Sequence, residues 1–231
     1  MPDQPAKPLA TPLAIGHRGA PTVETENTLA SIDAAIRAGA DWVEIDVKLT
    51  RDQVPVLLHD PTLHRIWDIA APISELNLAD LPPMIPTLHQ ALDRINGRGV
   101  RLLIDFTGLP EGIASINLVT DLGRQEEAAF TGGTDALAAV RAHDPAAIIA
   151  MSWESLVLPD EQTLDRVRPD YFNQAHELLD AKTIDIMHEG GLKVSTYTVD
   201  TPERMRWLAD NGVDAIISNR VATLIETLAA R

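Results

Sequence analysis

The stretch Leu13–Val47 reads LAIGHRGAPTVETENTLASIDAAIRAGADWVEIDV, with a short apolar run at each end and an amphipathic segment between them. The two runs, LAIG and WVEIDV, have the length and composition of buried strands. Between them, Asn27 or Thr28 can cap a helix, and Gly39 provides its C-terminal stop. The stretch therefore predicts a strand–helix–strand unit whose two strands run parallel.

The same alternation of short apolar runs and helical segments continues along the chain. Strands are expected at 13–16, 42–47, 54–58, 101–105, 147–152, 170–172, 193–197 and 214–218. The stretch 109–144 is expected to be mostly helical, with a turn at 131–134. Eight strands with helices between most of them, in 231 residues, fit a closed (β/α)8 TIM barrel better than an open sheet. We assign residues 13–231 to one α/β barrel domain and residues 1–12 to a flexible N-terminal segment.

The composition restricts the possible partners. The chain has 34 acidic and 19 basic side chains and a formal net charge of −15, whereas nucleic acids and anionic membranes require a basic face. It contains no cysteine, which excludes disulfides, thiolate metal sites and cysteine nucleophiles. It also lacks a long apolar run and a secretory signal, so we expect a cytoplasmic protein without stable membrane association. The composition indicates no oligomeric state.

Candidate site residues follow from the strand positions, because TIM-barrel enzymes carry their chemistry at the carboxyl ends of the strands. The polar residues expected there are His17 and Arg18 after the first strand, Glu44 and Asp46 on the second, His59 after the third, Asp105 on the fourth and Tyr197 on the seventh. All of them are expected to converge on one rim of the barrel.

Three of these residues, Glu44, Asp46 and Asp105, are carboxylates. They cannot all be ionised in a half-buried barrel mouth without a counter-charge. Because oxygen ligands without thiolates suit hard cations, the cluster predicts a site for Mg²⁺ or Ca²⁺.

The remaining candidates suit acid–base chemistry on an anionic substrate. His17 and His59 can transfer protons, because imidazole titrates near neutral pH. Arg18 offers a guanidinium fork that matches either two phosphate oxygens or the carboxylate of Glu44. One histidine could remove a proton from a nucleophile while the other protonates a leaving alkoxide.

Several motifs resemble those of the glycerophosphodiester phosphodiesterase family. They are His17-Arg18-Gly19, Glu26-Asn27-Thr28-Leu29, Gly39 to Val47, Leu49-Thr50-Arg51-Asp52, Val54 to Asp60, Thr62-Leu63, and more weakly Ile85 to Leu88, Ser152-Trp153, Tyr197 to Asp200 and Gly212 to Ile217. The resemblance implies a metal-dependent hydrolase that converts glycerophosphodiesters to glycerol 3-phosphate and an alcohol. It implies catalytic histidines at His17 and His59, phosphate contact by Arg18 and metal ligands at Glu44, Asp46 and an acidic residue on the fourth strand.

The chain departs from the family pattern at several positions. Asp105 and Thr107 stand where the family has Glu and Lys, Tyr197 where it has Trp, Asn219 where Asp is commoner, and His89 where it has Glu. Lys48 is a possible replacement for the missing lysine charge, although we favour a solvated surface lysine. Tyr197 can still form a wall for the substrate.

Other functions remain open at this point. The same residues would serve a lyase that releases a cyclic phosphate, or a hydrolase of sugar-phosphate or lysophospholipid diesters. A barrel that binds phosphate esters without turnover is an alternative from another class. A sugar-phosphate isomerase or aldolase ranks last, because it would not need both His17 and His59.

Overall fold

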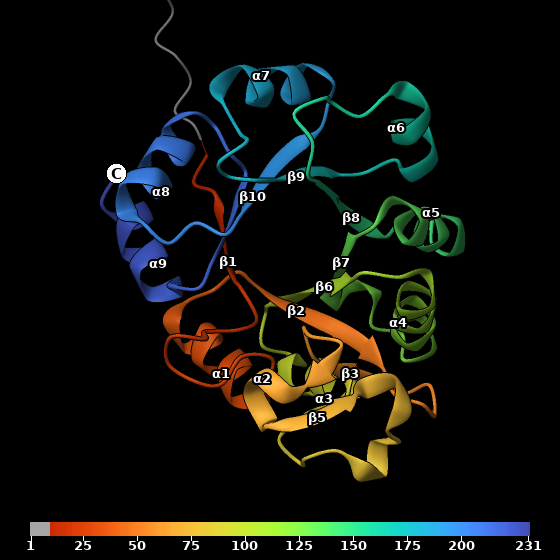
Figure 1. Cartoon of the computed structure of the whole chain (residues 1–231). Coiled ribbons are helices and arrows are strands. Elements are labelled where there is room, and N and C mark those ends of the chain that lie inside the picture. The colour runs from red at the N-terminus through yellow and green to blue at the C-terminus, as the bar shows by residue number, and fades with distance from the viewer. Residues whose placement is uncertain (1–9) are drawn as a thin grey trace, which may run out of the picture.

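Eight short strands, rich in buried aliphatic side chains, pair in parallel and close a barrel in the computed structural model, which describes residues 10–231 (Figure 1). β1 pairs with both β2 and β11, which joins the two ends of the sheet. The barrel strands are β1 (Leu13–Gly16), β2 (Trp42–Leu49), β6 (Arg101–Phe106), β7 (Ala128–Gly132), β8 (Ile148–Trp153), β9 (Tyr171–Ala175), β10 (Lys193–Tyr197) and β11 (Ala215–Ser218). The predicted single-domain TIM barrel is confirmed. Of the segment expected to be flexible, residues 1–9 lie outside the described residues.

Helices surround the barrel and cover its outer face (Figure 1). They are α1 (Leu29–Ala38), α3 (Leu88–Ile95), α4 (Leu109–Asp121), α5 (Thr134–His143), α6 (Glu161–Val167), α7 (Ala181–Glu189), α8 (Pro202–Asp210) and α9 (Val221–Ala229). Local signals set their ends. The Thr28 hydroxyl accepts a hydrogen bond from the Ser31 N–H and so caps α1, and Gly39 ends this helix at φ 98°. Asn27, the other candidate for this cap, has a different role, described below.

The run at 54–58, expected to be a barrel strand, lies outside the barrel. It forms β3 (Pro55–Leu57), which pairs antiparallel with the end of β2. The chain then forms β4 (Thr62–Leu63), α2 (His64–Trp67) and β5 (Ile69–Pro72), followed by two 3-10 turns, η1 (Ile73–Glu75) and η2 (Leu78–Asp80). This excursion has its own small core, made of Val56, Leu58, Leu63, Ile73 and Ile85. His59 therefore belongs to the excursion rather than to the end of a barrel strand.

The stretch 109–144 is mostly helical, as expected, but the expectation missed a barrel strand, where only a turn was expected at 131–134. After α4 and a short 3-10 turn, η3 (Gln125–Glu127), the chain enters the barrel as β7 and leaves it as α5. β7 reads Ala-Ala-Phe-Thr-Gly, which has little intrinsic preference for a strand. Its pairing with both β6 and β8, and the burial of all five residues, stabilise it instead. One barrel strand was thus predicted wrongly, at 54–58, and one was missed, at 128–132. The predicted count of eight barrel strands was therefore still right.

The side chains on the inward faces of the strands change from apolar to polar along the barrel axis. A buried apolar cluster fills the amino-terminal half and contains Ile15, Trp42, Leu103, Ala129, Ala150, Tyr171, Ala215 and Ile217. Two residues further along the same strands, on the same face, the side chains become polar: Glu44, Asp105, Thr131, Ser152 and Asn173. The barrel is thus closed by packing at one end and presents polar groups at the carboxyl ends of its strands.

Candidate active site

A pocket of about 600 Å³ opens at the carboxyl ends of the barrel strands. The seven residues predicted from the sequence all line it: His17, Arg18, Glu44, Asp46, His59, Asp105 and Tyr197. Further lining residues include Lys48, Thr107, Thr131, Ser152, Trp153, Glu154 and Asn173. The fold therefore brings the predicted set to one place, although His59 arrives there from the excursion.

The three carboxylates form one cluster. Each of Glu44, Asp46 and Asp105 offers an oxygen within 4.8 Å of the oxygens offered by the others. Asp46 and Asp105 are register partners on the adjacent strands β2 and β6, which explains their proximity. Burial, together with the charges of Asp46 and Asp105, holds the pKa of Glu44 well above its usual range. Burial and the charge of Asp46 likewise raise the pKa of Asp105 to about 6.

A hard divalent cation fits this cluster on chemical grounds. All three ligand groups are carboxylates, and no thiol exists in the chain. Crowded, buried negative charges favour either a proton or a cation, and a cation would satisfy three carboxylates at once. The cluster is thus a candidate metal centre.

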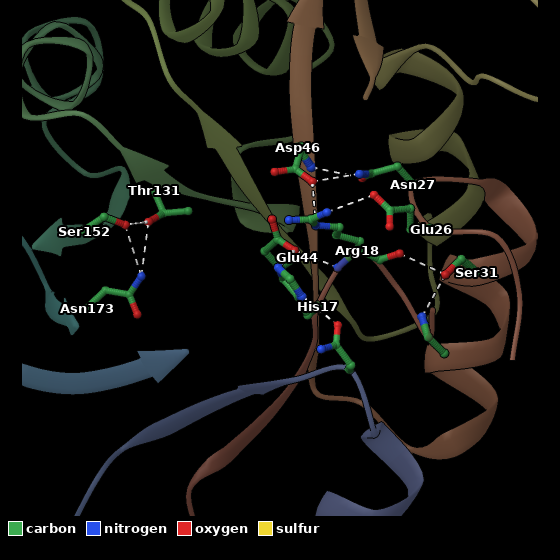
Figure 2. Close-up of polar contacts among 12 residues, drawn as sticks. His17, Arg18, Glu26, Asn27, Ser31, Glu44, Asp46, Thr131, Ser152 and Asn173 are labelled. Atoms are coloured by element: carbon green, nitrogen blue, oxygen red, sulfur yellow. Dashed lines mark hydrogen bonds and ion pairs between the residues drawn. The ribbon is translucent and has the colours of Figure 1, made fainter. Parts of the chain in front are cut away.

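Asn27 holds one of these carboxylates in place, a role that the sequence did not reveal. Its amide nitrogen donates to Asp46 Oδ2 at 2.7 Å, and its amide oxygen accepts from the Asp46 backbone N–H at 3.0 Å (Figure 2). Asn27 is buried and has a φ of 56°, in the left-handed region that asparagine tolerates better than most residues. The only sequence signal was its place in the Glu-Asn-Thr motif, where it was considered as a helix cap.

Arg18 contacts the cluster through both its backbone and its side chain. Its N–H donates to Glu44 Oε2 at 2.7 Å, while the guanidinium lies 2.9 Å from Glu26 and 3.2 Å from Asp46 (Figure 2). The guanidinium therefore pairs with Glu26 and Asp46, whereas the sequence offered Glu44 as its partner. Glu26 in turn accepts two hydrogen bonds from Arg65 on α2. Arg18 is thus oriented by acidic groups on two sides.

His17 is oriented by a polar chain from the last barrel strand. Its Nδ1 lies 2.8 Å from Asn219 Oδ1, and the Asn219 amide nitrogen donates to Asp200 at 2.7 Å. Because a carboxylate only accepts, the Asn219 oxygen must face His17, and His17 must carry its proton on Nδ1. Nε2 is then free and lies 4.0 Å from Glu44. Burial lowers the pKa of His17, and the Arg18 charge contributes to this effect, so the imidazole is neutral at pH 7.

His59 has a charged partner instead. Its Nδ1 lies 2.6 Å from Asp60 Oδ1, and the other Asp60 oxygen accepts from Arg65. The hydrogen bond from Arg65, helped by that from His59, lowers the pKa of Asp60, so this carboxylate is ionised. An ionised partner requires the His59 proton on Nδ1, which leaves Nε2 as the free nitrogen. Arg65 therefore links the surroundings of His59 to those of Arg18 through Glu26.

Away from the carboxylate cluster, the pocket carries a group of uncharged polar side chains. Thr131 and Ser152 share a hydrogen bond of 2.9 Å, and the Asn173 amide donates to Ser152 at 3.2 Å. Figure 2 shows this group apart from the cluster around Glu44 and Arg18. Tyr197 also lines the pocket, and burial raises its pKa to about 12, so its hydroxyl stays protonated.

Lys48 lies in the pocket, contrary to our preference for a solvated surface lysine. Its ammonium donates to the Thr107 hydroxyl at 3.0 Å, across the adjacent strands β2 and β6. The alternation of side chains along β2 predicted that Lys48 shares a face with Glu44 and Asp46, and the structure confirms that all three line the pocket.

Among residues 10–231, no helix is long and apolar enough to cross a membrane.

Comparison with known proteins places this site in a family. The chain is 27% identical to the glycerophosphodiester phosphodiesterase of Caldanaerobacter subterraneus subsp. tengcongensis, over 92% of this chain and 96% of that protein. Its fold resembles that of an Oleispira antarctica phosphodiesterase solved with the product sn-glycerol-3-phosphate, with a TM-score of 0.88, 24% identity and coverage of 95% and 97% of the two chains. It also resembles the glycerophosphodiester phosphodiesterase of Thermotoga maritima, with a TM-score of 0.79, 20% identity and coverage of 93% and 97%. The family model matches residues 17–223, and the chain therefore belongs to the glycerophosphoryl diester phosphodiesterase family, whose members are phosphoric diester hydrolases.

Proposed function

We propose that this protein is a metal-dependent hydrolase that converts glycerophosphodiesters to sn-glycerol 3-phosphate and an alcohol. The observation that carries the proposal is one pocket, in a chain of this family, that combines three clustered carboxylates, two histidines with a free Nε2 and the guanidinium of Arg18. The Oleispira antarctica phosphodiesterase, which shares the fold, was solved with sn-glycerol-3-phosphate as its product. This supports the same product for this chain.

Glu44, Asp46 and Asp105 would hold the cation, which we propose to be Mg²⁺ or Ca²⁺. When bound, such an ion supplies positive charge that stabilises the developing negative charge on the phosphoryl oxygens. Asn27 and the Arg18 N–H keep two of the carboxylates in place before any ligand arrives. Preorganisation of this kind reduces the cost of assembling the site.

Arg18 and Tyr197 contact the substrate in our proposal. The Arg18 guanidinium has further N–H groups beyond those paired with Glu26 and Asp46, and these can bind a non-bridging phosphate oxygen. Tyr197 remains a neutral phenol and provides part of the pocket wall with a hydroxyl donor. The phosphate would therefore lie in the pocket within reach of both Arg18 and the cation held by the carboxylate cluster.

The histidines divide the proton transfers between them. His17 is neutral and buried, so its Nε2 accepts the proton of the attacking hydroxyl, which belongs to water or to a neighbouring substrate hydroxyl. A new P–O bond forms as the bond to the leaving alcohol breaks. His59, whose Nδ1–H faces the ionised Asp60, acts as the acid in its doubly protonated, imidazolium form and transfers its Nε2 proton to the departing alkoxide, which leaves as the neutral alcohol. If the substrate hydroxyl attacks first, water opens the resulting cyclic phosphate in a second step.

A metal-by-substrate screen tests the proposal. The metal-free protein would be incubated with Mg²⁺, Ca²⁺ or Mn²⁺ and a panel of glycerophosphodiesters with neutral, zwitterionic and anionic alcohol groups. Release of the alcohol and phosphorus NMR of the products would be measured. We expect metal-dependent formation of sn-glycerol 3-phosphate. A cyclic phosphate as the final product would show a lyase, and binding without turnover of any diester would show a non-catalytic barrel.

A further inference from the structure

One cation in the pocket, Lys48, lies in no direct ion pair with the described residues. Among residues 10–231, the Lys48 ammonium makes no ion pair within 4.0 Å, and its hydrogen bond is to the neutral hydroxyl of Thr107, at 3.0 Å. Lys48 is only partly exposed and lines the pocket beside the carboxylate cluster. An ammonium group has three donors, so two remain for a ligand.

The charges around the pocket show why this lysine is unusual. Two side chains lining it, Arg18 and Lys48, are permanently cationic at neutral pH. Arg18 is already engaged by Glu26 and Asp46, and a bound divalent cation would be offset by three carboxylates. Lys48 therefore makes no direct ion pair among the described residues; its charge acts on the nearby Asp105, and its ammonium donors stay available to a ligand.

The geometry keeps this charge close to the site. β2 and β6 are paired in parallel with Asp46 beside Asp105, so two residues further on Lys48 lies beside Thr107. Because side chains two residues apart on a strand share a face, Lys48 lies on the pocket side of β2 together with Glu44 and Asp46. A lysine stem is flexible, and its hydrogen bond to the exposed Thr107 hydroxyl places the ammonium at the mouth of the pocket.

We propose that Lys48 binds the phosphate group of the substrate, and that Thr107 is a positioning residue that holds the Lys48 ammonium for this contact. The inference rests on the proposed function and extends it, because it assigns a second cationic phosphate contact besides Arg18. A phosphodiester carries one negative charge, and further charge develops on its oxygens as the displacement proceeds. An ammonium with two unused donors and no direct ion pair is suited to bind both charges.

The test compares Lys48→Met with the parent enzyme and with Lys182→Met. Lys182 is an exposed residue on α7 outside the pocket, so its substitution removes the same charge elsewhere. We expect kcat/KM of the metal-loaded Lys48→Met enzyme to fall about 10- to 100-fold, the range for loss of a hydrogen bond to a charged group. Thr107→Val should lower it by about 3- to 10-fold, mostly through KM, because it frees the lysine without removing its charge. Lys182→Met should match the parent.

Binding measurements distinguish phosphate contact from an effect on the metal. Titration calorimetry would measure Mg²⁺ binding to each variant, and then binding of inorganic phosphate and of sn-glycerol 3-phosphate to the Mg²⁺-loaded proteins. We expect Lys48→Met to bind Mg²⁺ at least as tightly as the parent and to bind both phosphates about tenfold more weakly. A Lys48→Met enzyme with the kcat/KM or the phosphate affinity of the parent would overturn the proposal. A Lys48→Met enzyme that loses as much Mg²⁺ affinity as phosphate affinity would also overturn it.

A relocated charge provides a second test. In the double variant Lys48→Met with Thr107→Lys, the ammonium would reach the same space from the neighbouring strand. We expect recovery of at least tenfold in kcat/KM over Lys48→Met. No recovery would show that Lys48 contributes something other than its charge. If the parent enzyme hydrolyses no diester, the proposed function fails, while the phosphate titrations still decide the role of Lys48.

Discussion

The Asn219 side-chain oxygen lies 2.8 Å from Nδ1 of His17, although the two residues are 202 positions apart in the chain. The Asn219 amide nitrogen donates to Asp200, and its backbone N–H donates to the same carboxylate. This arrangement leaves a single hydrogen-bonding pattern for His17, with the proton on Nδ1 and a free Nε2 toward the pocket. Asn219, which follows β11, thus determines which nitrogen of His17, which follows β1, can act as a base.

Asn219→Asp should therefore harm this enzyme, even though Asp is the commoner family residue at this position. The new carboxylate would lie against Asp200, and like charges in a partly buried place repel. We expect a loss of about 1–2 kcal/mol in unfolding free energy, corresponding to a few degrees in Tm, and a fall in kcat of at least tenfold. Thermal unfolding and steady-state kinetics would measure both effects.

The matched control exchanges both residues. In Asp200→Asn with Asn219→Asp, the amide at 200 can donate to the carboxylate at 219, and its oxygen can still accept the backbone N–H. We expect the double variant to recover the Tm lost by Asn219→Asp. A Tm equally low in the single and double variants would contradict the explanation by charge repulsion.

The two histidines should respond differently to the leaving group. With a glycerophosphodiester of an ordinary alcohol, His17→Ala and His59→Ala should each lower kcat by about 10²–10⁴-fold. With a p-nitrophenyl phosphodiester, whose leaving group needs no proton, His59→Ala should regain most of its activity while His17→Ala should not. Equal losses on both substrates would contradict the assignment of His59 as the acid. Circular dichroism would check that both variants remain folded.

Removal of the metal should have an effect on stability as well as on activity. EDTA should abolish turnover, and addition of Mg²⁺ or Ca²⁺ at 100 times its Kd should raise the unfolding free energy by about 2.7 kcal/mol. Glu44→Gln should raise the Tm of the metal-free protein, because it removes one of three crowded carboxylates, yet it should weaken metal binding. The exposed Glu24→Gln variant is the control, and we expect it to change neither property. Full activity after metal removal would refute the metal centre.

Arg65 should stabilise the protein near neutral pH and lose this effect in acid. Burial raises the pKa of Glu26, but the hydrogen bonds from Arg65 and Arg18 outweigh it and lower this pKa to about 2, against an ordinary value of 4.5. The resulting stabilisation is complete above about pH 4.5 and is lost as the pH falls toward 2. Arg65→Met should therefore cost about 1–2 kcal/mol at pH 6, and the difference from the parent should shrink below pH 4.5.

Unfolding in urea across this pH range would measure that difference. Arg166→Met, which breaks the exposed pair with Asp135, is a suitable control because Arg166 is about as exposed as Arg65. We expect it to cost no more than about 0.5 kcal/mol at any pH. A cost for Arg65→Met that stays constant from pH 6 to pH 3 would show that the Glu26 pair does not supply the stabilisation.

Much of the candidate site could be predicted from the sequence because strand geometry is local. The period of two along 42–47 puts Glu44 and Asp46 on one face, and the rule for barrel enzymes selects the residues at strand ends. The strand count was right, but the assignment of two strands was not. The run at 54–58 is a strand by local pattern and pairs outside the barrel, whereas Ala128–Gly132 has a weak pattern and pairs inside it.

The sequence by itself determined the alternation of strands and helices, the residue types of the site and the family motifs, because these depend on neighbouring residues. The tertiary structure alone decided the partners: Asn27 with Asp46, Asn219 with His17, and Lys48 with Thr107. Such contacts depend on which strands are adjacent in the closed barrel and on their register, since a shift of one residue would turn these side chains to the other face. The position of the His17 proton and the place of the Lys48 ammonium in the pocket follow from those contacts.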